Sequence, residues 1–373
     1  MAKNTPLLLG LELSGTGAHP ASWRRADSRA EELFSPDYWV DALGAADRAG
    51  IDLAFVPDSF ALQPVGARGR LDAVAVTARV AALTRRIGLI PQATVTHTEP
   101  FHLSKAIASL DFASAGRAGW EVGVSAAEAK LFGRKAEQDS HSRWFEADEA
   151  IEVVTRLWDS WEDDAEIRDT ATGRFVDREK LHYIDFTGDN FAVKGPSITP
   201  RSPQGQPLVS VRAAETHSAR TAVQRADLIR IVAPDLTTAA AVRRELRAAI
   251  TTAGRDPDQV RVLLDIDVHL AATVDQAAAE VAQLEEWIAT EAPRTVFHIG
   301  TADELRGILA QIHTGGVADG VVLRPLALTA VLPYLTELAP AATGRSEAAP
   351  EGSAPTLRER LGLPRPANRH VHA

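Results

Sequence analysis

The chain has 373 residues, of which 45% are hydrophobic and 24% are charged, as is typical of a globular protein with a large core. Its formal net charge of −10 argues against binding to nucleic acid or to an anionic membrane. No cysteine is present, which excludes disulfides, thiolate metal sites and a cysteine nucleophile. The N-terminus has no signal-peptide pattern, and no apolar run approaches the roughly 18 residues needed to span a bilayer. We therefore expect a soluble, cytoplasmic protein.

Short apolar runs alternate with longer helical patterns, which is typical of repeated βα units around a parallel sheet. The predicted strands are 7–13, 51–56, 86–92, 119–124, 208–211, 228–232, 260–270 and 320–323. The predicted helices are 36–49, 71–84, 99–115, 143–161, 215–225, 237–253, 274–290 and 302–314. Eight strands with interleaved helices predict an α/β protein of the (β/α)8 TIM-barrel class, with the barrel spanning residues 1–339.

Two segments interrupt this rhythm. Residues 162–206 are polar and too long for a simple connection, so we expect an insertion after the fourth helix that folds over one end of the barrel. Residues 340–373 are expected to form a flexible linker, rich in Ala, Pro, Gly and Ser up to residue 355, and then a C-terminal tail. The arginines of the tail either face solvent or dock on a neighbouring subunit.

In a parallel barrel, functional side chains gather at the carboxyl ends of the strands. Asp58 follows the second strand and either accepts a hydrogen bond from a ligand N–H or caps a loop. Glu121 lies within the fourth strand, where a buried carboxylate needs a partner or a raised pKa. Residues 212–218 open a helix, which is either a phosphate site or an ordinary first turn carrying the acid Glu215. The histidines form no metal-binding motif, and no residue is assigned as an acid or base.

Several long runs resemble the nitrilotriacetate and dibenzothiophene-sulfone branch of the bacterial luciferase-like, flavin-dependent monooxygenases. They are SGTGAHPASWRRADSRAEELF, FVPDSF, RIGLIPQATVTHTEPFHLSKAIASLDFASAGRAGW, EVVTRLWDSWEDDA, HYIDFTGDNFAVKGPSITPRSPQGQP and TLRERLGLPRPANR. The resemblance implies a (β/α)8 barrel, usually a homodimer, that binds reduced FMN at its carboxyl-terminal mouth. It also implies a separate flavin reductase as partner, and O2 as the co-substrate that oxygenates a small organic molecule.

The residues that the resemblance places around the flavin include both matches and departures. Asp58 and Thr94 match the family pattern. Glu121 replaces the usual asparagine, and Ser140 and Trp144 replace a histidine and a tyrosine. Completing this predicted flavin set are His141, one position from the replaced histidine, and the phosphate turn, where Glu215 replaces a serine beside Thr216 and Ser218.

These departures leave three hypotheses for the function. The first is a two-component, FMN-dependent monooxygenase with an altered flavin site. The second is a family member that has lost flavin and serves as a binding or partner subunit. The third is an oxidoreductase that uses the deazaflavin F420 and transfers hydride.

Overall fold

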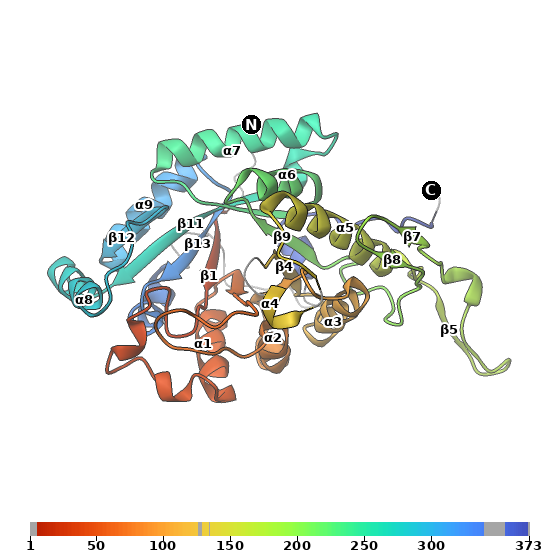
Figure 1. Ribbon diagram of the computed structural model, residues 1–373, viewed down its shortest axis with the longest axis horizontal. Helices are drawn as coiled ribbons and strands as arrows, with labels where there is room; N and C mark the ends of the chain where they lie inside the picture. Colours follow the sequence, from red (N-terminus) through yellow and green to blue (C-terminus); the bar gives the residue numbers. More distant parts are fainter. Residues whose placement is uncertain (1–5, 126–128, 134, 339–354, 372–373) are drawn as a thin grey trace.

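The computed structural model describes residues 6–125, 129–133, 135–338 and 355–371. Eight parallel strands form its centre, and strand pairing between β1 and β13 and between β10 and β11 closes them into a barrel (Figure 1). The barrel strands are β1 (Leu8–Glu12), β2 (Leu53–Val56), β3 (Gly88–Thr94), β4 (Gly119–Gly123), β9 (Leu208–Arg212), β10 (Leu228–Ile231), β11 (Arg261–Leu270) and β13 (Gly320–Pro325). The predicted (β/α)8 fold is confirmed.

Helices lie between successive strands on the outside of the barrel (Figure 1). The long ones are α1 (Pro36–Arg48), α2 (Ala73–Ala81), α3 (Pro100–Ala113), α5 (Ser140–Asp159), α6 (Thr216–Arg225), α7 (Leu236–Thr252), α8 (Val274–Trp287) and α9 (Ala302–Thr314). Helix α5 begins before the predicted residue 143, because the Asp139 side chain accepts a hydrogen bond from the Ser142 N–H and caps it. In the described part of the chain, no helix is long and apolar enough to cross a membrane.

A ninth strand, β12 (Val296–Gly300), was not predicted from the sequence. It pairs with the last five residues of β11, Ile266 to Leu270, and lies beside the barrel rather than in its wall. The ten residues of β11 make this pairing possible, because the strand runs on past the barrel contacts it makes with β10. The sequence VFHIG is too short, and Phe297 in it too exposed, to give a clear strand pattern.

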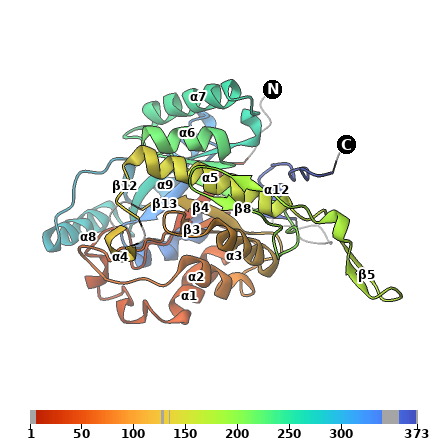
Figure 2. The same cartoon turned by 45° about the vertical axis from the view of Figure 1, so that its right-hand side comes forward.

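The insertion differs in part from the prediction. Its hairpin, β5 (Glu166–Asp169) and β6 (Arg174–Val176), projects away from the barrel instead of folding over an end (Figure 2). No side chain of this hairpin is fully buried, so nothing holds it against the barrel. A second short pair, β7 (Phe186–Thr187) and β8 (Ala192–Val193), follows. The last residues of the insertion reach the amino-terminal end, where Gln204 donates to Asp111 and to the Ala118 carbonyl.

The C-terminal tail closes the amino-terminal end of the barrel. Its helix α12 (Leu357–Arg360) and the residues after it bury Leu357, Leu361 and Leu363 against the inward-facing apolar side chains of the strands. Those side chains are Leu8, Leu53, Phe55, Ile90, Leu208, Leu228, Leu263 and Val322. We call the three tail leucines, Leu357, Leu361 and Leu363, the plug. Gly88 leaves room for the plug, because a Cβ at this position would lie 2.7 Å from the Leu357 side chain.

The tail arginines bind within the same chain. The buried Arg358 forms an ion pair with Asp227 at 2.8 Å and donates to the Gln206 carbonyl at 2.7 Å. Arg365 pairs with Asp163 of the insertion at 2.6 Å. The predicted linker, 340–355, lies outside the described residues except for its last residue.

Towards the carboxyl-terminal end, beyond the apolar side chains that contact the tail, the interior of the barrel contains charged side chains. Arg230 on β10 is fully buried and donates to three carboxylates from three other strands. The acceptors are Asp265 at 2.9 Å, Glu121 at 2.9 Å and Glu12 at 2.5 Å. Three further ion pairs flank this group: Arg324 with Glu12 at 3.2 Å and with Asp267 at 2.7 Å, and Arg212 with Asp265 at 2.8 Å. We call these seven residues the barrel ion cluster.

In the barrel ion cluster, burial and the neighbouring opposite charges shift the pKa values in opposite directions. Burial raises the pKa of Glu121, although Arg230 opposes the shift. Burial also acts to raise the pKa of Glu12, but Arg230, Arg324 and Arg212 outweigh it and hold that pKa well below its usual value. The carboxylates around Arg230 in turn raise its pKa against the effect of burial, so the guanidinium stays charged.

Shortening Leu357 to alanine should destabilise the fold. The side chain is fully buried in the plug, so Leu357→Ala leaves a cavity and is expected to cost about 2–5 kcal/mol of unfolding free energy. Urea denaturation followed by circular dichroism measures this change. Val371→Ala is the control in the same tail, because Val371 is 53% exposed and should tolerate truncation. Equal midpoints for the two variants would show that the plug does not support the barrel.

Replacing Arg230 by methionine should be more damaging than replacing an exposed arginine. Arg230→Met leaves three buried carboxylates without their shared cation, which is expected to cost about 3–5 kcal/mol. Arg294→Met is the control, because Arg294 and its partner Glu291 are both more than four-fifths exposed. Thermal melts of both variants test this, and an unchanged melting temperature for Arg230→Met would contradict it.

Candidate active site at the barrel mouth

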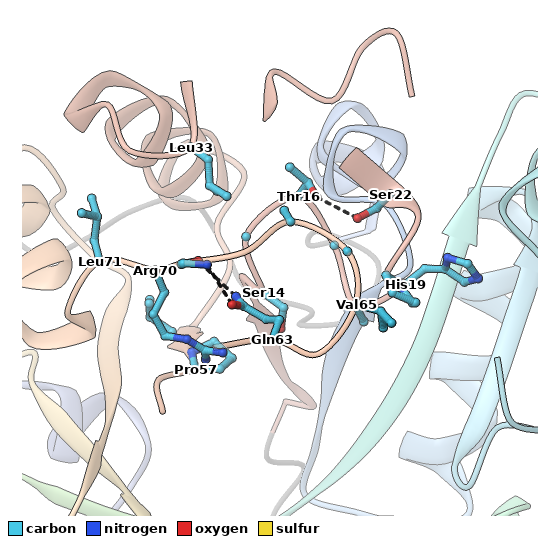
Figure 3. Close-up of a pocket in the computed structure, with 18 of the residues that line it drawn as sticks. Ser14, Thr16, His19, Ser22, Leu33, Pro57, Gln63, Val65, Arg70 and Leu71 are labelled. Carbon is cyan, nitrogen blue, oxygen red and sulfur yellow. Dashed lines mark hydrogen bonds between the residues drawn. The ribbon is translucent and has the colours of Figure 1, made fainter. Parts of the chain in front are cut away.

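A pocket of about 340 Å³ opens at the carboxyl end of the barrel, between the loops that follow β1 and β2 (Figure 3). Its apolar wall includes Leu33, Trp39 and Val56, and Arg324 reaches it from the end of β13. Small-molecule sites have volumes in this range, and active sites of (β/α)8 enzymes form at this end of the barrel. The pocket is therefore the candidate substrate site.

Hydrogen bonds within the two loops hold the pocket open. In the first loop, the Thr16 and Ser22 hydroxyls lie 2.8 Å apart, and Gly17 adopts a φ of +146°. A Cβ on Gly17 would lie 2.3 Å from the Leu326 carbonyl oxygen, so only glycine fits there. In the second loop, the Gln63 amide both donates to and accepts from the Gly69 backbone, at 3.1 and 3.0 Å. The walls of the pocket are thus built from local contacts.

Asp58 and Thr94 lie together, as the resemblance predicts, but they line a separate hollow of about 340 Å³ between α2 and α3. The Asp58 carboxylate accepts the backbone N–H groups of Ser59, at 2.7 Å, and Ala73, at 2.9 Å. Burial raises the pKa of Asp58. Asp58 therefore fixes the start of α2, the capping role that the sequence left open beside ligand binding.

Glu121 points into the barrel and has the partner that its burial requires. That partner is Arg230, which was not among the predicted site residues, and neither were Asp265 and Arg324. A usable signal was present, because Arg230 interrupts the apolar strand LIRI, and Asp265 and Asp267 occupy alternate positions in RVLLDIDVHL. Glu121 is thus part of the barrel ion cluster.

The turn before α6, predicted as the phosphate site, is held by the Glu215 carboxylate. One carboxylate oxygen accepts from the Trp144 indole N–H at 2.6 Å, and the other accepts from the Ser140 hydroxyl at 2.7 Å. The Ser140 hydroxyl and, with a smaller effect, the Trp144 indole lower the pKa of Glu215, so it is charged at neutral pH. The Glu215 N–H donates to Ser218 at 3.0 Å. The Glu215 carboxylate thus accepts the hydrogen bonds that Ser140 and Trp144 donate from the first turns of α5.

The other residues predicted for this turn lie close by. His141 and Trp144 line a small hollow of about 90 Å³ between α5 and α6, and the His141 ring centroid is 5.3 Å from that of His217. Thr216 is exposed, whereas Ser218 is buried. The structure therefore brings together Ser140, His141, Trp144 and Glu215, as the resemblance implies.

This arrangement disfavours binding of the FMN phosphate. A phosphate placed at the turn would meet the charged Glu215, at a cost on the order of 1–4 kcal/mol for charges about 4 Å apart, between the limits of water and a protein surface. The candidate flavin residues are also divided, because the hollow with Asp58 and Thr94 shares no lining residue with the hollow at His141 and Trp144.

Comparison with known proteins identifies the family. Residues 16–328 match the family model described as luciferase-like monooxygenase. N-acetyl-S-(2-succino)cysteine monooxygenase of Bacillus subtilis (strain 168) is 33% identical over 292 residues, which is 77% of this chain but 66% of that protein. One of the subunits of pristinamycin IIA synthase from Streptomyces pristinaespiralis is 32% identical over 331 residues, 88% of this chain and 90% of that protein.

The structural comparison agrees with the sequence comparison. EDTA monooxygenase from Chelativorans sp. BNC1 superposes with a TM-score of 0.82 at 25% identity, covering 96% of this chain and 99% of the other. The fold, the family model and the relatives above 30% identity all point in one direction. The chain belongs to the luciferase-like monooxygenase family.

Proposed function

We propose that this chain is the oxygenase component of a two-component, flavin-dependent monooxygenase that oxygenates a small organic molecule with O2. The observation that carries the proposal is the pocket of about 340 Å³ at the carboxyl end of the barrel, in a member of a monooxygenase family. The buried side chains Leu33, Trp39 and Val56 give the pocket a dry wall, which would keep water from the substrate. We further propose a homodimer that acts in the cytoplasm.

Reduced FMN, delivered by a separate reductase, is the cofactor that we propose. It supplies the oxygen chemistry when bound, whereas this chain supplies the substrate pocket and the adjoining barrel ion cluster. Because Glu215 occupies the phosphate turn, the chain should hold the flavin weakly and purify without colour. Weak retention agrees with delivery of the flavin for each reaction cycle by a partner.

A second candidate function is a partner subunit that binds no flavin. The specific observation that favours it is again the Glu215 carboxylate, bonded to Ser140 and Trp144 at the phosphate turn. The similarity to a protein named as a subunit of a synthase, over 90% of its length, supports this candidate. Flavin titration separates the two candidates, and F420 in the same titration tests a deazaflavin enzyme.

The monooxygenase proposal is tested by coupled turnover. The purified chain, an NADH-dependent flavin reductase, FMN and a panel of small organic acids and sulfur compounds are incubated under 18O2. We expect at least one compound to gain a single 18O atom, detected by mass spectrometry, only when this chain is present. Reductase with catalase, without the chain, is the control for free peroxide. Equal oxygenation with and without the chain, or none across the panel, would refute the proposal.

Removing the Glu215 charge should improve FMN binding. Glu215→Ser frees the Trp144 indole N–H and removes a like charge, so FMN affinity should rise about tenfold or more, as calorimetry can measure. Riboflavin is the matched ligand control, because it has no phosphate and its affinity should not change. A wild-type chain that already binds FMN tenfold more tightly than riboflavin would show that Glu215 does not block the phosphate.

A further inference from the structure

The candidate substrate pocket has an unusual charge for this chain. The whole chain carries 50 acidic and 40 basic residues, yet the lining of the pocket contains two arginines, Arg70 and Arg324, and no aspartate or glutamate. A pocket with this lining favours a ligand that carries negative charge. Such a ligand needs a side chain in the lining whose donors are not already bonded within the protein.

Most polar side chains in the lining already have partners inside the protein. Ser14 donates to Glu12 at 3.0 Å, and Arg324 is paired with Glu12 and Asp267. The Gln63 side-chain amide donates to the Gly69 carbonyl and accepts from the Gly69 N–H.

The remaining polar groups of the wall are similarly engaged. The Thr16 and Ser22 hydroxyls bond to each other. The Trp39 indole donates to the Leu33 carbonyl at 3.0 Å. His19 accepts from the Ala21 N–H through Nδ1, at 3.1 Å, and its Nε2 lies 3.2 Å from Glu285. Each of these side chains therefore already has a hydrogen-bond partner inside the protein.

Arg70 is the exception. Its Nε is buried and has no hydrogen-bond partner, and its only hydrogen bond in the described residues is a long one, 3.5 Å, to the Ala61 carbonyl. No ion pair in the described part of the chain involves Arg70. Asp58 lies within electrostatic range, but its carboxylate already accepts two backbone N–H groups. Figure 3 shows Arg70 beside Pro57, on the wall across the pocket from His19.

We propose that the substrate of this pocket is a small organic carboxylate whose carboxylate group is bound by Arg70. A guanidinium presents parallel N–H groups that match the two oxygens of a carboxylate, and in the described residues the Arg70 guanidinium makes one long hydrogen bond and no ion pair. The apolar body of the substrate would then lie against Leu33, Trp39 and Val56. This inference rests on the proposed function, because it names the substrate class of the same site.

The test measures binding without flavin or oxygen, so its outcome is independent of the turnover assay. The probes are matched pairs that differ in charge but little in shape: benzoate and benzamide, 4-phenylbutyrate and its amide, succinate and succinamide. Calorimetry on the full chain should show at least one carboxylate binding about tenfold or more tightly than its amide. Arg70→Gln should bring the affinity of that carboxylate down to that of its amide and leave the amide unchanged.

Arg68→Gln is the matched control, because Arg68 is an exposed arginine of the same loop that bonds to the Pro64 carbonyl and does not line the pocket. It should leave both affinities unchanged. Three results would overturn the inference: amides that bind as tightly as carboxylates, an Arg70→Gln variant that retains the preference, or no carboxylate that binds up to 20 mM, on the order of the weakest affinities measurable. Carboxylate binding without turnover would instead count against the proposed function alone.

Discussion

The buried guanidinium of Arg230 is the constraint on which the mouth of this barrel depends. It joins Glu12, Glu121 and Asp265, which come from β1, β4 and β11, and so links strands across the barrel. A buried ion cluster of this kind adds little net stability, because its desolvation cost offsets its attraction, but it is intolerant of losing one member. Its structural effect is to fill the centre of the mouth, so that the open pocket lies to one side, between the loops after β1 and β2.

Whether a charged side chain has partners inside the protein also explains why Glu215 and Arg70 have different roles. The Glu215 carboxylate accepts from Ser140 and Trp144, so the turn that could bind a phosphate already carries an anion of the chain itself. Arg70, by contrast, forms no ion pair with any residue that the structure describes, and its buried Nε has no hydrogen-bond partner there. Under the functions proposed above, the turn at Glu215 would hold a flavin phosphate poorly, and Arg70, in a separate pocket, would bind a substrate carboxylate. That combination suits an oxygenase component that receives its flavin from a partner.

Much of the fold could be predicted from the sequence, because parallel strands covered on both faces appear as continuous apolar runs separated by amphipathic helices. The structure confirms all eight barrel strands, although the charged residues of the barrel ion cluster interrupt several of the apolar runs. Strand β12 did not follow it, because its five residues are mixed in polarity and partly exposed. The hairpin at 166–176 was misplaced because nothing in a polar segment says whether it packs against the barrel or projects into solvent.

The order of residues along the chain was enough to predict the barrel, the family and the chemical groups at the strand ends, including the carboxylates of Glu121 and Glu215. What those groups do became clear only from the folded arrangement, because each depends on partners that lie far away in the chain. Arg230 meets Glu121 across 109 positions, and Trp144 meets Glu215 across 71. Likewise, the tail leucines are buried only through contacts with side chains from strands distant in the sequence. Local patterns set which residues face inward, whereas ion pairing and packing between distant segments set which of them remain free to bind a ligand.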